Sequence, residues 1–76
     1  MSKEEIIEKV KVDYECVLIN FRVYDSAKEL FKNEKENLSN FTKETEGKHL
    51  LEEENVFKVG EKFIYATEWH DAEWDD

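Results

Sequence analysis

The fold is decided by residues 55–69, NVFKVGEKFIYATEW, which carry the clearest local signal in the chain. Residues 56–59 and 62–69 are two runs rich in β-branched and aromatic side chains, and such side chains favour strands. The Gly60–Glu61 pair between the runs suits a two-residue turn with glycine in the first position. The stretch therefore predicts a β-hairpin.

Strict alternation along this hairpin would give it two faces. One face would carry Phe63, Tyr65, Thr67 and Trp69, and the other Phe57, Val59, Ile64 and Ala66. An isolated hairpin is only marginally stable in water, so it must pair with or pack on an earlier part of the chain.

Residues 10–24, VKVDYECVLINFRVY, fit two different structures. Apolar side chains recur every three or four positions, as they do on one face of a long amphipathic helix. Eight of these fifteen residues are Val, Ile, Tyr or Phe, which favour a strand. If the segment is a strand, its apolar alternation changes parity near residues 16–18, and such a change implies a bulge or bend.

Two capping boxes, in which a serine is followed three residues later by a glutamate, mark helix starts. The first begins at Ser2 and predicts a short helix over roughly residues 3–9. The second begins at Ser26 and predicts a helix from about residue 27, whose inward-facing residues are Ala27, Leu30 and Phe31. Because a helix already running from residue 3 would not need a second start, we favour strand for roughly residues 9–24.

The stretch 33–46 is polar, with Leu38 and Phe41 as its large apolar anchors, and Gly47 marks a turn. The whole pattern predicts an α+β fold: a small antiparallel β-sheet with one or two short helices and a C-terminal β-hairpin. Seventy-six residues allow a single acidic domain over 1–76, since domains much smaller than this rarely bury enough surface. We expect its acidic tail, 70–76, to be free to fray.

Charge excludes several classes of partner. Twenty acidic against eleven basic residues give a formal net charge of −9, which argues against direct nucleic-acid binding and against anionic membrane surfaces. With 39% hydrophobic and 13% aromatic residues, the chain is rich enough in apolar side chains to fold rather than stay disordered. The charged start MSKEEIIEK and the single cysteine do not resemble a signal peptide or a disulfide framework. We therefore expect a cytoplasmic protein.

Signs of catalysis or metal binding are sparse. The sequence lacks a glycine-rich phosphate loop, a GxSxG elbow and an HExxH pair. Cys16 could act as a nucleophile only if the fold brought it to His49 or His70, and a lone cysteine in a β-rich run is usually a small buried hydrophobe. Acids beside His70 would hold a divalent ion weakly, without the pattern of an EF-hand or zinc site. We expect no enzyme, no cofactor and no metal.

The acidic residues concentrate in the second half of the chain. Residues 39–76 hold eleven acidic and four basic side chains, and no lysine or arginine follows Lys62. Crowded carboxylates repel one another, so they serve either solubility or recognition of a basic partner. Acids also recur at i, i+2 (13/15, 44/46, 52/54 and 71/73/75). On extended backbone this spacing is about 6.7 Å, which is close to two nucleotide steps of DNA, about 6.8 Å.

In size, acidity, aromatic content and lack of catalytic motifs, the chain resembles the small phage-encoded DNA-mimic inhibitors. The resemblance implies a protein that presents carboxylates where DNA presents phosphates and occupies the DNA-binding surface of a basic host protein, in host takeover or anti-defence. Among targets, a nucleoid-associated protein of the HU type is slightly favoured, because its DNA contacts are mainly to backbone and shape. Restriction, CRISPR or other DNA-processing proteins come close behind. Location would then be the host cell cytoplasm.

The residues expected to bind this partner are the clustered acids and the two tryptophans beside them, because interfaces are enriched in tryptophan. They are Glu52, Glu53, Glu54, Glu68, Trp69, Asp71, Glu73, Trp74, Asp75 and Asp76. The alternative is a small non-catalytic regulatory or assembly subunit that binds through a sheet edge or an aromatic face, with the acid serving solubility. A homodimer is a further alternative, since a single small sheet can leave an apolar face uncovered.

Overall fold

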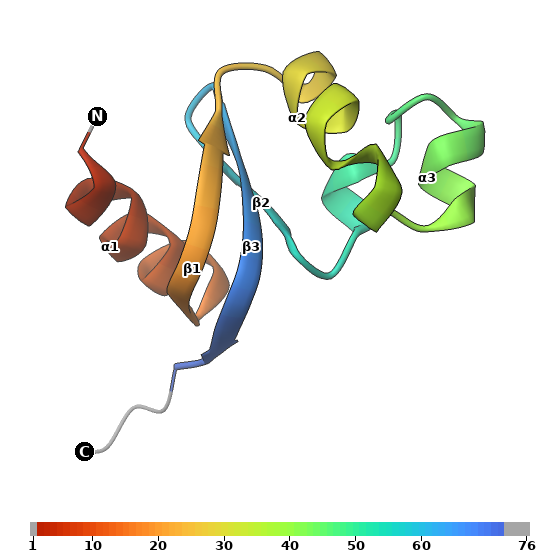
Figure 1. Ribbon diagram of the computed structural model, residues 1–76. Helices are drawn as coiled ribbons and strands as arrows, with labels where there is room; N and C mark the ends of the chain where they lie inside the picture. Colours follow the sequence, from red (N-terminus) through yellow and green to blue (C-terminus); the bar gives the residue numbers. More distant parts are fainter. Residues whose placement is uncertain (1, 73–76) are drawn as a thin grey trace.

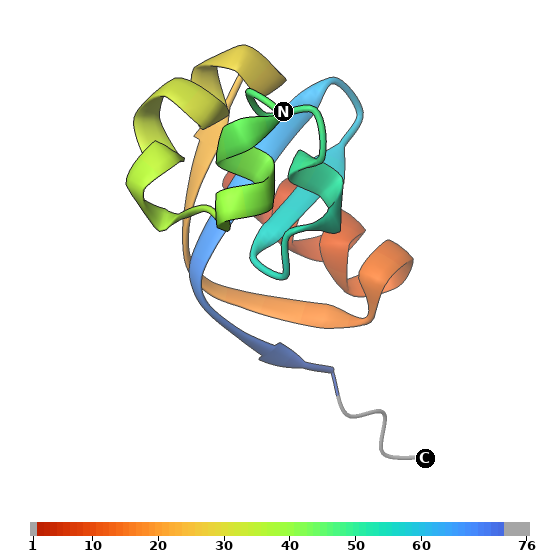
Figure 2. The same cartoon turned by 90° about the vertical axis from the view of Figure 1, so that its right-hand side faces the viewer.

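A computed structural model describes residues 2–72 and has the predicted α+β fold (Figure 1). Three antiparallel strands form one sheet in the order β1-β3-β2. Helix α1 packs on one face, and the helical segments between β1 and β2 cover part of the other (Figures 1 and 2). The elements are α1 Lys3–Tyr14, β1 Cys16–Tyr24, α2 Ala27–Glu34, η1 Lys35–Asn37, α3 Asn40–Glu44, η2 Leu50–Glu52, β2 Val56–Val59 and β3 Lys62–Asp71.

Helix α1 is longer than predicted, because residues 9–14 are helical and not strand. Its start is as expected, with the Ser2 side chain accepting a hydrogen bond from the Glu5 N–H. Ile6 and Val10 are buried against the sheet, whereas the β-branched Val12 is 64% exposed. The apolar stripe at helical spacing therefore outweighs the β-propensity of individual residues. The helix ends where Glu15 adopts a left-handed conformation, with φ of 56°.

The hairpin is confirmed, with β2 and β3 pairing from Val59↔Lys62 to Val56↔Tyr65. Gly60, with φ of 60°, occupies the first position of the turn, where a left-handed backbone favours glycine. Strand β3 continues two residues beyond the predicted end, to Asp71, and the Ala72 N–H donates to the Glu15 carbonyl at 2.8 Å. Residues 70 and 71, which we expected to fray, are therefore paired with β1. The rest of the expected tail, residues 73–76, lies outside the described residues.

The β1–β3 ladder contains two bulges that cancel. Leu18 pairs with Trp69 and Asn20 with Glu68, so Ile19 is an extra residue on β1. Phe21 then pairs with Ala66, so Thr67 is an extra residue on β3. The bulge predicted near residues 16–18 therefore lies at Ile19, and β3 carries a second one that the sequence pattern did not indicate.

These bulges change which face Trp69 occupies. Strict alternation predicted it beside Phe63 and Tyr65, but Trp69 packs on the α1 face with Phe57. Its ring lies edge-on to that of Phe57 at 5.7 Å, and its Nε1 donates to the Asn55 side chain at 2.8 Å. The other predicted core residues of the hairpin lie on the faces that alternation predicted. Phe57, Val59, Ile64 and Ala66 pack toward α1, and Phe63 and Tyr65 pack on the opposite side.

The two faces of the sheet carry two separate apolar clusters. The first lies under α1 and joins Ile6, Val10, Cys16, Leu18, Phe57, Val59, Ile64 and Ala66. The second lies under the intervening helices and joins Leu30, Leu38, Leu50, Val56 and Tyr65. In the view of Figure 2 those helices lie over one half of the sheet, and the ends of β1 and β3 near Cys16 and Asp71 extend beyond them.

Helix α2 begins as predicted, with the Ser26 side chain accepting the Glu29 N–H at 3.1 Å. Leu30 is fully buried, and Ala27 and Phe31 pack against the second cluster. The expectation for Phe41 is wrong: it is 54% exposed and stacks on His49, with ring centroids 4.4 Å apart. Leu38 does act as an anchor and is buried.

Replacing Ser26 with alanine is expected to lower the free energy of unfolding by about 1 kcal/mol, because the Glu29 N–H loses its acceptor. Replacing Ser26 with aspartate should cost much less, since aspartate also caps helices well. Urea unfolding monitored by circular dichroism measures both variants. Equal losses for alanine and aspartate would contradict a capping role.

Candidate functional site

The first predicted acidic cluster, residues 52–54, does not present three equivalent carboxylates. Glu53 accepts hydrogen bonds from the Ser39 backbone N–H at 3.1 Å and from the Ser39 and Thr42 hydroxyls. Burial raises the pKa of its carboxyl, but the hydrogen bonds from Ser39 and Thr42 more than offset this and lower the pKa below its usual value. Glu53 therefore ties residues 50–54 to the start of α3 and is a structural residue.

Glu52 and Glu54 are both exposed. The Glu52 carboxylate is bonded to the Nδ1 of His49. Glu54 precedes Asn55, which bonds to β3 twice. The Asn55 carbonyl accepts a hydrogen bond from the Ala66 backbone N–H, and its side-chain oxygen accepts one from the Trp69 indole N–H. These two bonds place Glu54 beside the middle of β3, close to where the second acidic cluster begins.

In the second predicted acidic cluster, which begins at residue 68, Glu68 and Asp71 are exposed on β3. Glu68 accepts a hydrogen bond from the Asn20 side-chain amide at 2.9 Å, which fixes its carboxylate without neutralising it. Trp69 is half-buried, and its indole N–H joins β3 to the Asn55 side chain. The remaining predicted partner-binding residues, Glu73, Trp74, Asp75 and Asp76, lie outside the described residues.

A third carboxylate, Glu15, joins this end of the sheet. It caps α1 directly before β1, and Asp71 pairs in register with the next residue, Cys16. Burial raises the pKa of the Cys16 thiol, and the charges of Asp71 and Glu15 raise it further, so both carboxylates act on the same thiol. We call Glu15, Glu54, Glu68 and Asp71 the acidic end. The sequence clusters did not include Glu15, because it meets Asp71 only through strand pairing.

In the three sets that the structure describes in full, the i, i+2 spacing of acids does not produce the phosphate-like rows that we expected. Asp13 lies in α1 and Glu15 is left-handed. Glu44 ends α3, and Glu46 has φ of 56°. Residue 52 lies in the 3-10 helix η2, so 52 and 54 are not on one extended strand either. Of the fourth set, 71/73/75, the structure describes only Asp71, which lies in a strand. The acidic end is therefore assembled from separate segments rather than from one periodic run.

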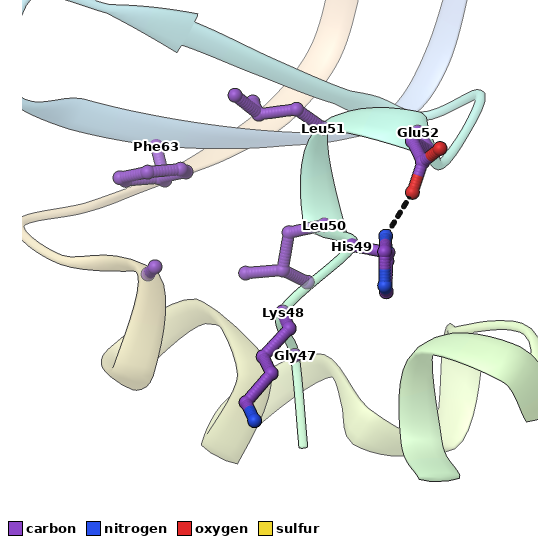
Figure 3. Close-up of a pocket in the computed structure, with 8 residues that line it drawn as sticks. Gly47, Lys48, His49, Leu50, Leu51, Glu52 and Phe63 are labelled. Atoms are coloured by element: carbon purple, nitrogen blue, oxygen red, sulfur yellow. Dashed lines mark hydrogen bonds and ion pairs between the residues drawn. The ribbon is translucent and has the colours of Figure 1, made fainter. Parts of the chain in front are cut away.

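An apolar hollow of about 290 Å³ lies at the opposite part of the molecule, between α2 and η2 (Figure 3). Leu50 and Phe63 form its inner wall, and the bonded His49–Glu52 pair lies at one side. Leu51 lines it as well and is 53% exposed. Phe41, stacked on His49, extends the exposed apolar surface beyond the hollow. The shape and lining suit one apolar side chain of a partner.

The candidate nucleophile–base pair is not assembled. Cys16 is buried in the cluster beneath α1, whereas His49 lines the hollow on the other side of the sheet. His70 pairs with Val17 and so faces away from Cys16, and its ring contacts the Asp71 carbonyl. Within residues 2–72, no group of three or more His, Cys, Asp or Glu side chains is arranged to hold a metal ion. No helix in this range has the length and apolar character to cross a bilayer.

A buried glutamate, which sequence reasoning missed, organises the junction between the sheet and α2. Glu34 is 2% exposed and accepts hydrogen bonds from Arg22 Nε at 2.6 Å, Arg22 Nη2 at 2.9 Å, Asn37 Nδ2 at 3.0 Å and the Tyr24 hydroxyl. The bonds from Arg22 lower the pKa of Glu34, and burial opposes this only in part. In the sequence, nothing distinguishes Glu34 from its acidic neighbours.

Comparison of the chain with protein-family models, with curated proteins and with solved structures gave no match.

Proposed function

We propose that the chain is a non-catalytic inhibitor that binds a basic DNA-binding protein in place of DNA, with a nucleoid-associated protein of the HU type as the favoured target. The observation that carries the proposal is the acidic end: Glu15, Glu54, Glu68 and Asp71 come from three separate segments of the chain and are all exposed. Strand pairing fixes the backbone of Glu68 and Asp71, whose side chains alternate to opposite faces at the end of the sheet, and the bond from Asn20 also fixes the Glu68 carboxylate before binding.

The acidic end costs the isolated molecule self-repulsion. The ion pairs among residues 2–72 join carboxylates to Arg22, His49 and Lys62, and the four residues of the acidic end are not in these pairs. A lysine- or arginine-rich surface would relieve that repulsion on binding. Association should then be fast and strongly weakened by salt, as DNA binding to the same surface would be.

The proposal predicts that the chain releases a labelled DNA duplex from a purified HU-type protein at about 50 mM salt and far less at about 300 mM. Replacing Glu54 and Glu68 with glutamine and Asp71 with asparagine should weaken this competition about tenfold or more. Glutamine at position 68 keeps an oxygen that accepts from Asn20, so the fold is preserved. Fluorescence anisotropy of the duplex provides the measurement.

The matched control removes three charges elsewhere, by replacing Glu36, Glu44 and Glu61 with glutamine. All three are exposed and lie outside the acidic end. This control should weaken competition only about two- to threefold, through net charge alone. Equal losses in the two triple variants would mean that net charge acts without a defined surface. Failure to displace DNA from HU-type, restriction or CRISPR proteins would exclude DNA mimicry.

The apolar hollow favours a second candidate, a small regulatory or assembly subunit that binds through this aromatic face. Exposed Phe41 and Leu51 beside a hollow lined by Leu50 and Phe63 match the apolar anchor regions of interfaces. Replacing Leu51 with serine separates the two functions. The variant should keep its competition with DNA if the acidic end binds the partner, and lose partner binding if the hollow does.

A further inference from the structure

A second hollow in this acidic molecule is lined mainly by lysines. It has a volume of about 510 Å³ and lies between α2 and the end of α3, and its lining residues are Lys28, Phe31, Lys35, Lys43 and Glu46. Lys28 and Lys35 are seven residues apart, which places them on the same side of the α2–η1 segment with Phe31 between them. Lys43 comes from the last turn of α3. We call this site the lysine hollow.

The charges of the lysine hollow are not balanced within the described chain. Three ammonium groups and the Glu46 carboxylate give it a net charge near +2. In residues 2–72 the cations of the ion pairs are Arg22, His49 and Lys62, and none is a lysine of the hollow. Lys35 instead lies 5.9 Å from the centroid of the Phe31 ring. Acids outnumber bases almost two to one in this chain. Three lysines brought together from α2, η1 and α3 repel one another unless an anion joins them.

The aromatic floor of the lysine hollow is held in place by the backbone. Gly47 has φ of +85°, and a Cβ at this position would lie 3.1 Å from the Cβ and Cγ of Phe31. The chain therefore passes directly against Phe31, which is half-buried and packs on the second apolar cluster. A fixed ring with cations around it suits a ligand that has both a planar group and a negative charge.

We propose that the lysine hollow binds a small phosphate monoester whose organic part carries a planar ring, as in a nucleoside monophosphate. The phosphate charge of about −1.5 to −2 at pH 7 matches the net charge of the hollow, whereas a carboxylate would neutralise only half of it. The lysines bind the phosphate oxygens, the ring stacks on Phe31, and Glu46 accepts a hydrogen bond from an amino or hydroxyl group of the ligand. This site is separate from the acidic end and does not depend on the proposed function.

The test is a titration of the ¹⁵N-labelled protein with adenosine monophosphate, followed by amide chemical shifts. Saturable shifts are expected at residues 28–35 and 43–47, with adenosine giving none and inorganic phosphate binding about tenfold more weakly or worse. Replacing Lys28 and Lys43 with glutamine should weaken binding of adenosine monophosphate at least about tenfold, since the charge-assisted hydrogen bonds of two lysines to the phosphate are lost.

The control replaces Lys9 and Lys32 with glutamine. Lys32 lies on the same helix as Lys28 but does not line the hollow, and Lys9 is exposed on α1. This variant should keep binding within about twofold. Equal weakening in the two variants, shifts that follow all lysines without saturating, or equal affinity for inorganic phosphate would each overturn the proposal. So would the lack of any shift at about 10 mM ligand, where even millimolar affinity saturates the site.

Discussion

Replacing Glu34 with alanine is expected to lower the free energy of unfolding by about 3 kcal/mol. A domain of this length is stabilised by only about 4–11 kcal/mol, so the variant should lose a large part of its stability. Glu34 is 2% exposed and accepts hydrogen bonds from Arg22, Tyr24 and Asn37. Its removal leaves the hydroxyl of Tyr24 and the amide of Asn37 without their acceptor at a partly buried site, and such groups are costly to leave unpaired.

The partly exposed Arg22 moderates this cost. Its side chain is 53% exposed, so water can solvate the guanidinium once the carboxylate is gone, and the loss stays below that of a fully buried pair. Urea unfolding followed by far-UV circular dichroism gives the change in free energy. Replacing the exposed neighbour Glu36 with alanine removes the same charge and should change stability by less than about 0.5 kcal/mol. Similar effects at both positions would contradict a structural role for the Glu34 network.

The same network predicts a dependence on pH. Hydrogen bonds from Arg22 lower the pKa of Glu34 in the folded state below its usual value of 4.5, which the unfolded chain keeps. The stabilisation is therefore fully present above pH 4.5 and is lost as the pH falls toward the lower pKa of the folded state. The difference in stability between the wild type and Glu34→Gln should shrink over this acidic range, because glutamine does not titrate.

Deleting Ile19 alone is expected to destabilise the chain by about 3 kcal/mol or more, whereas deleting Ile19 and Thr67 together should restore most of that loss. Ile19 and Thr67 are the extra residues of the two bulges. Without Ile19 alone, Thr67 stays as an extra residue on β3 with no extra residue on β1, so the two ends of the ladder are displaced by one residue relative to each other. A one-residue slip would turn buried side chains such as Leu18 out of the cluster beneath α1. Without both residues, Leu18, Asn20 and Phe21 would face Trp69, Glu68 and Ala66 in an unbroken ladder.

The measurement is the urea midpoint of the two single deletions and of the double deletion. We expect the free energy of unfolding of the double deletion to lie within about 1 kcal/mol of the wild-type value, and that of each single deletion to be far lower. This result would show a large positive coupling between two sites on different strands. If the double deletion is as unstable as the single ones, the bulges do not act as a compensating pair.

Local sequence signals predicted those parts of the fold that depend on neighbouring residues. The serine caps of α1 and α2 and the hairpin around Gly60 depend on backbone groups a few residues away, and all three were predicted. The boundary between α1 and β1 was wrong, because residues 9–14 carry both a helical apolar stripe and β-branched side chains. Packing of Ile6 and Val10 against the sheet decides between them, and that contact is not local in sequence.

The candidate site was predicted less well, because a run of carboxylates does not reveal how each is used. Glu53 reads like its neighbours in the sequence but bonds to Ser39 and Thr42 in the fold. Glu15 belongs to the acidic end only because α1 stops at residue 14 and β1 pairs with β3. The lysine hollow likewise requires α3 to bring Lys43 near α2, and no local sequence signal indicates that contact.

The order β1-β3-β2 determines when this chain can fold as it is synthesised. The last strand in the sequence occupies the centre of the sheet, and the ladders join β1 and β2 only to β3. A nascent chain that ends before residue 62 therefore has two strands without a pairing partner and an α1 with little to pack on. Folding should wait until β3 has emerged from the ribosome, and chains arrested earlier should be sensitive to protease.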